Sequence, residues 1–138
     1  MMSEIGKFHH IGYLVKNIEK SKKVFEGMGF TISTNIVLDE IRKSKICFMD
    51  GNGTIVELIE PDKDSELHAL LKTYGNRPYH LCYKVDNMRD AVIQMKNNGF
   101  LMFKDSQNAP AISETAKVVF LMHAQIGMIE LVEEKKVD

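Results

Sequence analysis

Residues 8–30, FHHIGYLVKNIEKSKKVFEGMGF, align without a gap with residues 78–100, PYHLCYKVDNMRDAVIQMKNNGF, at an offset of 70. The positions at which both stretches carry the same residue are His10 and His80, Tyr13 and Tyr83, Val15 and Val85, Asn17 and Asn87, Gly29 and Gly99, and Phe30 and Phe100. An ungapped internal match of this length indicates that the chain consists of two copies of one module.

A second similarity follows each of these copies. TIVELIEP (residues 54–61) resembles GMIELVEE (residues 127–134), and the match pairs Glu57 with Glu130 at an offset of 73. The two modules therefore share a histidine position at their start, His10 and His80, and a glutamate position near their end, Glu57 and Glu130. Two modules with the same residue types at the same places predict a metal site on a pseudo-two-fold axis.

Each module is predicted to fold in the order β-α-β-β-β. Apolar and polar residues alternate in HHIGYLV and YHLCYKV, as in half-buried strands. Asn17 and Asn87 are suited to cap the amphipathic helices that follow, and Gly29 and Gly99 stand where these helices end. Residues 64–74, DSELHALLKTY, predict a short helix that links the modules. The strands expected after the two main helices are 31–37, 43–50 and 53–60 in module one, and 100–105, 117–124 and 127–134 in module two.

These modules predict an α+β fold in a single domain of residues 1–138. Module one spans about residues 8–60, the linker helix falls within residues 61–77, and module two spans about residues 78–134. A chain of 138 residues and 15.7 kDa, with 44% hydrophobic residues, is long enough to bury about two thirds of its unfolded surface. One folded unit is therefore expected.

The charge balance and the apolar pattern exclude several classes of protein. Eighteen basic and 19 acidic residues give a formal charge of −1, which provides no basic field for a nucleic acid. No apolar run reaches the roughly 20 residues that cross a bilayer, and the first residues, MMSEIGKF, lack the apolar core of a signal peptide. We therefore expect a cytoplasmic protein with no nucleic-acid or membrane partner. Cys47 and Cys82 lie in apolar segments without a C-x-x-C spacing and are expected to be reduced core thiols.

The two glutamates are the residues that most need an explanation. Glu57 lies in IVELI and Glu130 in MIELV, where an ionised carboxylate costs several kcal/mol unless it is paired or bound to a metal. A strand at a rim, which would expose the carboxylate to water, is the alternative for each. A divalent ion at the axis would collect both glutamates and both repeated histidines, and the two carboxylates would balance its charge. Such nitrogen and oxygen donors suit zinc, nickel, cobalt, iron(II) or manganese more than calcium.

The chain resembles the vicinal oxygen chelate superfamily through four motifs that cover most of residues 8–134, namely HHIGYLVKNIEKS, VELIEPDKDS, PYHLCYKVDNM and GMIELVE. The resemblance is strongest to the branch that contains glyoxalase I and methylmalonyl-CoA epimerase. It implies the glyoxalase/bleomycin-resistance fold, in which two βαβββ modules form a cupped mixed sheet around a metal. The ligands that it implies for a zinc, nickel or cobalt ion are His10, Glu57, His80 and Glu130.

For function, this resemblance favours a lactoylglutathione lyase-like enzyme of the glyoxalase I type. Such an enzyme abstracts a proton next to a carbonyl of a thiol-adduct substrate through a metal-stabilised enediolate, with Glu130 as the base and Glu57 as the second acid/base. Methylmalonyl-CoA epimerase is the alternative, and there Asp39 or Glu40 would be the second acid/base. The expected partners are a glutathione-adduct or thioester substrate and a second copy of the chain in a homodimer.

Other members of the superfamily leave further alternatives open. Ring-cleaving dioxygenases and fosfomycin-type thiol transferases use two histidines and one carboxylate, a pattern that leaves Glu57 without a purpose. A ligand-binding protein without a metal is the non-catalytic alternative. The sequence also leaves open whether a site forms within one chain or across a dimer.

Overall fold

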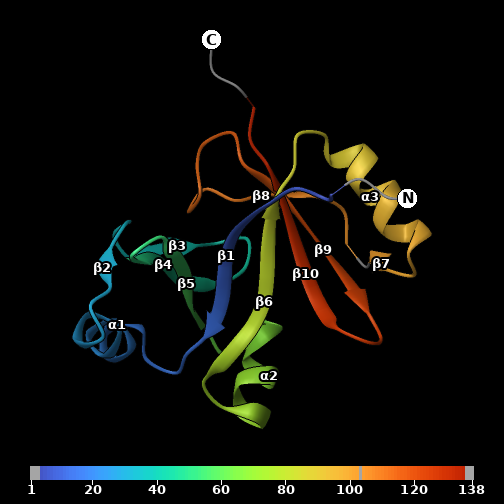
Figure 1. Ribbon diagram of the computed structural model, residues 1–138. Helices are drawn as coiled ribbons and strands as arrows, with labels where there is room; N and C mark the ends of the chain where they lie inside the picture. Colours follow the sequence, from blue (N-terminus) through green and yellow to red (C-terminus); the bar gives the residue numbers. More distant parts are fainter. Residues whose placement is uncertain (1–3, 103, 136–138) are drawn as a thin grey trace. The chain divides into compact units, whose positions relative to one another are not determined.

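Strand β1 (Lys7–Leu14) opens the fold with the first of the repeated histidine segments (Figure 1). The computed structural model describes residues 4–102 and 104–135, and these contain three helices and ten strands. They fall into two units, residues 10–79 and residues 4–9 together with the described residues from 80 onward. We call these the N-terminal unit and the C-terminal unit. That they act as one domain of residues 1–138 stays a prediction.

The N-terminal unit is a mixed sheet with one main helix. Its strands follow the order β2-β4-β5-β1, and β3 also pairs with β4. Strands β1 and β5 are parallel, whereas β4 and β5 form an antiparallel hairpin. The elements after β1 are α1 (Ile18–Gly27), β2 (Thr31–Ile32), β3 (Val37–Asp39), β4 (Ser44–Gly51), β5 (Thr54–Pro61) and α2 (Leu67–Tyr74).

The C-terminal unit repeats this plan. Its strands follow the order β6-β10-β9-β7, and β8 also pairs with β9. Strands β6 and β10 are parallel, and β9 and β10 form the antiparallel hairpin. Its elements are β6 (Arg77–Lys84), α3 (Met88–Asn97), β7 (Leu101–Met102), β8 (Gln107–Asn108), β9 (Lys117–His123) and β10 (Gly127–Glu133). The predicted α+β class with two βαβββ modules is thereby confirmed.

In each unit, two short strands replace the first strand predicted after the helix. The predicted strand 31–37 becomes β2 and β3, and the interruption has a local cause. The backbone N–H groups of Ser33 and Thr34 both donate to the carbonyl oxygen of Phe48, at 2.8 and 3.3 Å. Two residues therefore oppose one, as in a β-bulge. The predicted strand 100–105 shortens to β7, and its residue Phe103 lies outside the described residues.

The helices begin where the sequence predicts. Asn17 Oδ1 accepts a hydrogen bond from Lys20 N at 2.9 Å, and Asn87 Oδ1 accepts one from Asp90 N at 3.0 Å. Each contact satisfies one of the backbone donors that the first turn of a helix leaves without an intrahelical partner. Gly29 and Gly99 follow the helices with φ of +95° and +87°, a conformation that glycine adopts at little steric cost.

Each helix packs on one face of its own sheet. Ile18 of α1 packs with Val56 and Leu58 of β5, while Ala91 and Met95 of α3 pack with Ile129 and Leu131 of β10. The leucines occupy corresponding positions of the two modules, and both are 0% exposed. Burying one such side chain contributes about 1.5–3 kcal/mol. The opposite face of each sheet is therefore the one left to carry other chemistry.

The remaining predictions for the fold concern the linker, the cysteines and membranes. Helix α2 falls inside the predicted linker and is followed by Gly75 at φ +77°. Cys47 and Cys82 are free and buried, as predicted for core thiols, and burial raises the pKa of Cys47 to about 11. Among the residues that the structure describes, no helix is long and apolar enough to cross a membrane.

Candidate functional site

His10 and Glu57 form a buried pair within the N-terminal unit. Gly12 lies opposite Glu57 in the parallel ladder of β1 and β5, and His10 precedes Gly12 by two residues. Because side chains alternate along a strand, His10 therefore shares a sheet face with Glu57. His10 Nε2 lies 3.2 Å from Glu57 Oε1, and the two residues are 0% and 3% exposed. The rim alternative, in which water covers the carboxylate, is excluded for Glu57.

His80 and Glu130 form the equivalent pair within the C-terminal unit. Cys82 lies opposite Glu130 in the parallel ladder of β6 and β10, so the same alternation places His80 and Glu130 on one face. His80 Nε2 lies 3.1 Å from Glu130 Oε1, and the residues are 4% and 2% exposed. The structure thus brings the four predicted ligands together as two matching pairs, one in each unit.

A phenylalanine accompanies each pair, and the sequence did not predict this role. Phe48 lies opposite Glu57 in the antiparallel hairpin, and its ring stands edge-on to His10 with centroids 5.2 Å apart and planes at 84°. Phe120 lies opposite Glu130 and stands edge-on to His80 at 5.3 Å and 82°. Such T-shaped contacts contribute about 0.5–1.5 kcal/mol beyond area burial. The signal available in the sequence was the matching place of the two phenylalanines before the hairpin turns.

The surroundings of Glu130 are apolar. The face of β10 that carries it also carries Val132, and this residue packs with Cys82, Ala116 and Val118. A carboxylate in such a place is costly unless it is paired or bound to a cation. The neighbouring imidazole supplies part of that compensation, and a metal ion would supply more.

The geometry of each pair fits a metal. Zinc-type ions bind histidine nitrogen and carboxylate oxygen at about 2.0–2.2 Å, so two adjacent ligand atoms lie about 3.0–3.4 Å apart. The observed separations of 3.2 and 3.1 Å fall in this range. The donor set of one imidazole nitrogen and one carboxylate oxygen in each unit also suits a borderline divalent ion.

Asp39 and Glu40, the alternative acid/base residues, lie where β3 ends: Asp39 is the last residue of β3, and Glu40 begins the turn to β4. Asp39 is 1% exposed, and its two oxygens accept hydrogen bonds from Arg42, from the backbone N at 3.0 Å and from Nη1 at 2.8 Å. Glu40 is exposed. Asp39 therefore stabilises the turn, and the contacts that do so occupy both of its carboxylate oxygens.

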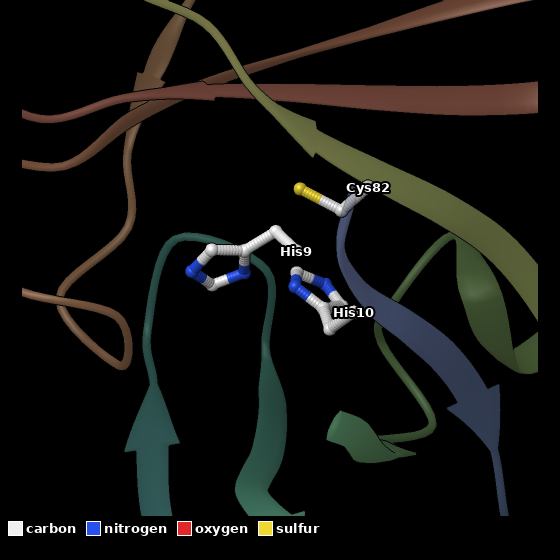
Figure 2. A group of neighbouring side chains, drawn as sticks. All are labelled: His9, His10 and Cys82. Atoms are coloured by element: carbon white, nitrogen blue, oxygen red, sulfur yellow. The ribbon is translucent and has the colours of Figure 1, made fainter. Parts of the chain in front are cut away.

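A further pair of potential ligands in the C-terminal unit was also not predicted. A ring nitrogen of His9 and the sulfur of Cys82 lie within 4.8 Å of one another (Figure 2). Imidazole and thiolate are zinc-type ligands, but a closed structural zinc site takes four of them. The clue in the sequence was the place of Cys82 two residues after His80, on the same face of β6.

The family profile of the Glyoxalase/Bleomycin resistance protein/Dioxygenase superfamily matches residues 9–133. This match covers most of the chain. The chain belongs to this superfamily. Membership confirms the resemblance to the vicinal oxygen chelate proteins.

Within the superfamily, the chain is similar to methylmalonyl-CoA epimerases. The mitochondrial enzyme of Bos taurus is 26% identical over 132 residues, which cover 92% of this chain and 74% of that protein. The structure of the epimerase from Mycobacterium tuberculosis has a TM-score of 0.81 at 16% identity, covering 98% of this chain and 94% of that chain. An epimerase solved in complex with methylmalonyl-CoA and NH4+ also has a TM-score of 0.81 at 16% identity, covering 98% and 99%. At these identities the structural likeness shows a common fold.

These relatives correct one prediction. The preference for a glyoxalase I-type lyase over an epimerase is wrong, because the curated relatives are methylmalonyl-CoA epimerases. The resemblance was to a branch that contains both kinds of enzyme, so the motifs that carried it could not separate them. The prediction of an enzyme agrees with the relatives, while the predicted homodimer stays a prediction.

Proposed function

We propose that this protein is a divalent-metal-dependent epimerase that acts on an acyl-CoA thioester of the methylmalonyl-CoA kind. The observation that carries the proposal is the buried pair of histidine and glutamate that occurs in both modules, at Nε2–Oε1 separations of 3.2 and 3.1 Å. The similarity to methylmalonyl-CoA epimerases supports the choice of substrate class. A carbon acid flanked by two carbonyl groups is also the kind of substrate for which paired carboxylates and a metal are suited.

In this proposal one zinc, nickel or cobalt ion is held by His10, Glu57, His80 and Glu130. The equivalence of the two pairs supports it, since a duplicated module offers the same donors from each copy. An ionised carboxylate offsets part of the charge of a divalent ion, and the two imidazoles would bind it in their neutral form. When bound, the ion supplies Lewis-acid stabilisation of the negative charge that develops on the carbonyl oxygen of the substrate.

The remaining chemistry belongs to the two glutamates. Glu130 accepts the proton as the C–H bond at the carbon between the carbonyl groups breaks, and the electron pair of that bond moves into the thioester carbonyl. Glu57, protonated, returns a proton to the opposite face of the same carbon. Each turnover therefore leaves the roles of the two carboxyl groups reversed until a reverse turnover or exchange with solvent restores them. The apolar side chains around Glu130 exclude water from this step.

Asp39 has no part in this mechanism, because Arg42 occupies both of its oxygens. Its neighbour Glu40 is the acid/base of the competing version. The two versions differ in the residue whose loss stops proton return.

Proton exchange in heavy water tests the proposal. The purified protein is analysed for metal and incubated with each epimer of methylmalonyl-CoA in turn, and incorporation of deuterium and conversion to the other epimer are followed. Glu130→Gln is expected to slow exchange from one epimer by about 100-fold or more, and Glu57→Gln to do the same for the other. Glu26→Gln, a change at an exposed position of α1, is the control and should leave both rates unchanged.

The outcomes separate the versions. Loss of exchange in Glu40→Gln with normal exchange in Glu57→Gln would transfer the second role to Glu40. Absence of both bound metal and exchange in the wild-type protein would overturn the epimerase proposal. Activity on the hemithioacetal of methylglyoxal and glutathione, measured in parallel, provides the comparison for substrate class.

A further inference from the structure

A second glutamate follows each candidate ligand by three residues and makes a contact of its own. Ile18 N, at the first residue of α1, donates to Glu60 Oε1 at 2.8 Å. Met88 N, at the first residue of α3, donates to Glu133 Oε2 at 2.6 Å. The partners are 42 and 45 residues apart in sequence. The same long-range contact thus occurs once in each unit.

These glutamates lie on the helix-covered face of their strands. Side chains three residues apart in a strand point to opposite faces of the sheet, so the side chain of Glu60 points to the face opposite that of Glu57. It continues the row of Val56 and Leu58, which pack with α1. In the other unit, Glu133 continues the row of Ile129 and Leu131, which pack with α3. In each motif, E-L-I-E and E-L-V-E, the first glutamate therefore lies on the face of the histidine. The last glutamate lies on the face of the helix.

The contact differs from an ordinary helix cap. Asn17 accepts from Lys20 N within the same first turn, so this hydrogen bond stabilises α1 without connecting it to the sheet. Glu60 connects the first residue of α1 to the C-terminal end of β5. A negative carboxylate is also favoured at the positive end of a helix. Lys45 Nζ lies 3.8 Å from Glu60 Oε2 and its side chain is half-exposed, so it contributes little to holding the carboxylate.

The Glu60 contact is one of two adjacent hydrogen bonds that join the end of β5 to the segment that follows β1. Strand β1, which carries His10, runs into α1 through only three residues, and Val15 N in this connection donates to Ile59 O of β5 at 2.9 Å. Glu60, the next residue of β5, then binds the start of α1. Val85 N donates to Val132 O at 2.9 Å in the same way, next to Glu133. The register of the histidine strand against the glutamate strand is thus held at its far end by two adjacent contacts.

We propose that Glu60 and Glu133 are positioning residues for the metal ligands. Each fixes the strand of one ligand glutamate, Glu57 or Glu130, against the strand of its histidine partner by binding the helix that follows the histidine strand. Each lies on the face of its strand opposite to the ligand glutamate, so it acts through the backbone. The inference rests on the proposed function in so far as metal binding is its readout.

The test compares two variants that each remove one hydrogen bond from the same helix start. Glu60→Ala removes the link between β5 and α1, whereas Asn17→Ala removes only the local cap. Both are expected to lower the unfolding midpoint to a similar degree. Binding of Co²⁺ to metal-free protein, followed by its visible absorption, is expected to weaken about tenfold in Glu60→Ala, the range found for groups that orient metal ligands, and to change less than twofold in Asn17→Ala. Glu60→Gln keeps an acceptor oxygen and is expected to restore most of the affinity.

The possible results decide between positioning and stability. Equal affinities in Glu60→Ala and wild type, or equal losses in Glu60→Ala and Asn17→Ala, would overturn the inference. If Glu60→Ala does not fold, Glu133→Ala against Asn87→Ala provides the same comparison in the other unit. If wild-type protein binds no Co²⁺, the proposed function fails, and the inference is then decided on metal-free protein. In that case the NMR signals of the His10 ring should shift in Glu60→Ala and not in Asn17→Ala.

Discussion

Cys82 lies directly opposite Glu130 in the parallel ladder of β6 and β10, whereas Gly12 occupies the corresponding place opposite Glu57. The two modules therefore surround their ligand pairs differently at one position. Since the N-terminal unit forms its pair beside a residue without a side chain, a thiol is not needed for such a pair to form.

Replacement of this thiol should accordingly spare the proposed metal site. We expect Cys82→Ala to bind the same amount of metal as the wild-type protein and to lose about 1 kcal/mol of stability, because only one buried sulfur atom is removed. Elemental analysis and denaturant unfolding measure the two quantities. Loss of the metal in this variant would mean that Cys82 is itself a ligand.

The two phenylalanines beside the histidines should differ in their importance for stability. Phe48 is 5% exposed, so Phe48→Ala is expected to cost about 3–5 kcal/mol through the cavity that it leaves. Phe120 is only partly buried, and Phe120→Ala should cost less. Urea unfolding of the two variants side by side checks the order, and Phe48→Leu, which removes less volume and keeps an apolar side chain, serves as the control. An equal or reversed order would show that burial does not set the difference.

Asp39 should prove structural rather than catalytic. In Asp39→Asn the amide still offers an oxygen to Arg42 but loses the charge that pairs with its guanidinium, and the Arg42 side chain is only 12% exposed. Breaking such a buried pair costs about 3–5 kcal/mol when one partner is removed, and the amide should retain part of this. We expect a lower unfolding midpoint with an epimerisation rate, measured well below that midpoint, close to that of the wild type. Loss of the rate with retained stability would instead make Asp39 the acid/base.

The buried thiol of Cys47 should lower the free energy of unfolding at alkaline pH. Burial raises the pKa of Cys47 from 9.0 to about 11, so the folded state holds the thiol proton more tightly than the unfolded state. This contribution to stability is fully present below the unfolded pKa of 9.0 and is lost as the pH rises toward about 11. The free energy of unfolding should therefore fall more steeply between these pH values in the wild type than in Cys47→Ala. Parallel curves for the two proteins would contradict the assigned cause.

Metal removal should destabilise the protein if both ligand pairs bind the ion. A ligand at 100 times its dissociation constant stabilises the folded state by about 2.7 kcal/mol. We expect the thermal midpoint to fall on treatment with a chelator and to recover with added Zn²⁺ or Co²⁺. The double variant His10→Ala with His80→Ala is the control and should not respond to either treatment.

Much of the site could be predicted because the chain contains an internal comparison. Considered alone, Glu57 could lie on a strand at the rim, where water covers its carboxylate. The equivalent glutamate at Glu130 disfavoured this, because the same exposure would have to occur in both modules. The caps at Asn17 and Asn87 were equally predictable, since the acceptor and donor lie three residues apart. Helix starts and ligand types are local properties, and local sequence is sufficient for them.

Other features depended on contacts between distant segments. The bulge that divides the predicted strand 31–37 arises from Phe48 on a neighbouring strand, and no property of residues 33 and 34 indicates it. The edge-on rings of Phe48 and Phe120 follow from the register of hairpins, which a shift of one residue would reverse. The motifs also could not separate a lyase from an epimerase, because they surround the candidate ligands and not the substrate.

By itself, the sequence determined that this protein has two β-α-β-β-β modules that carry a histidine and a glutamate at matching positions, His10 and Glu57 in one and His80 and Glu130 in the other. Periodicity and capping residues are sufficient for this, because they act over a few positions. Only the tertiary structure decided that each glutamate lies within 3.2 Å of its histidine, and that the next glutamate of the strand binds the start of the helix. These contacts join residues more than 40 positions apart, and strand register, which depends on the packing of the whole sheet, brings them together.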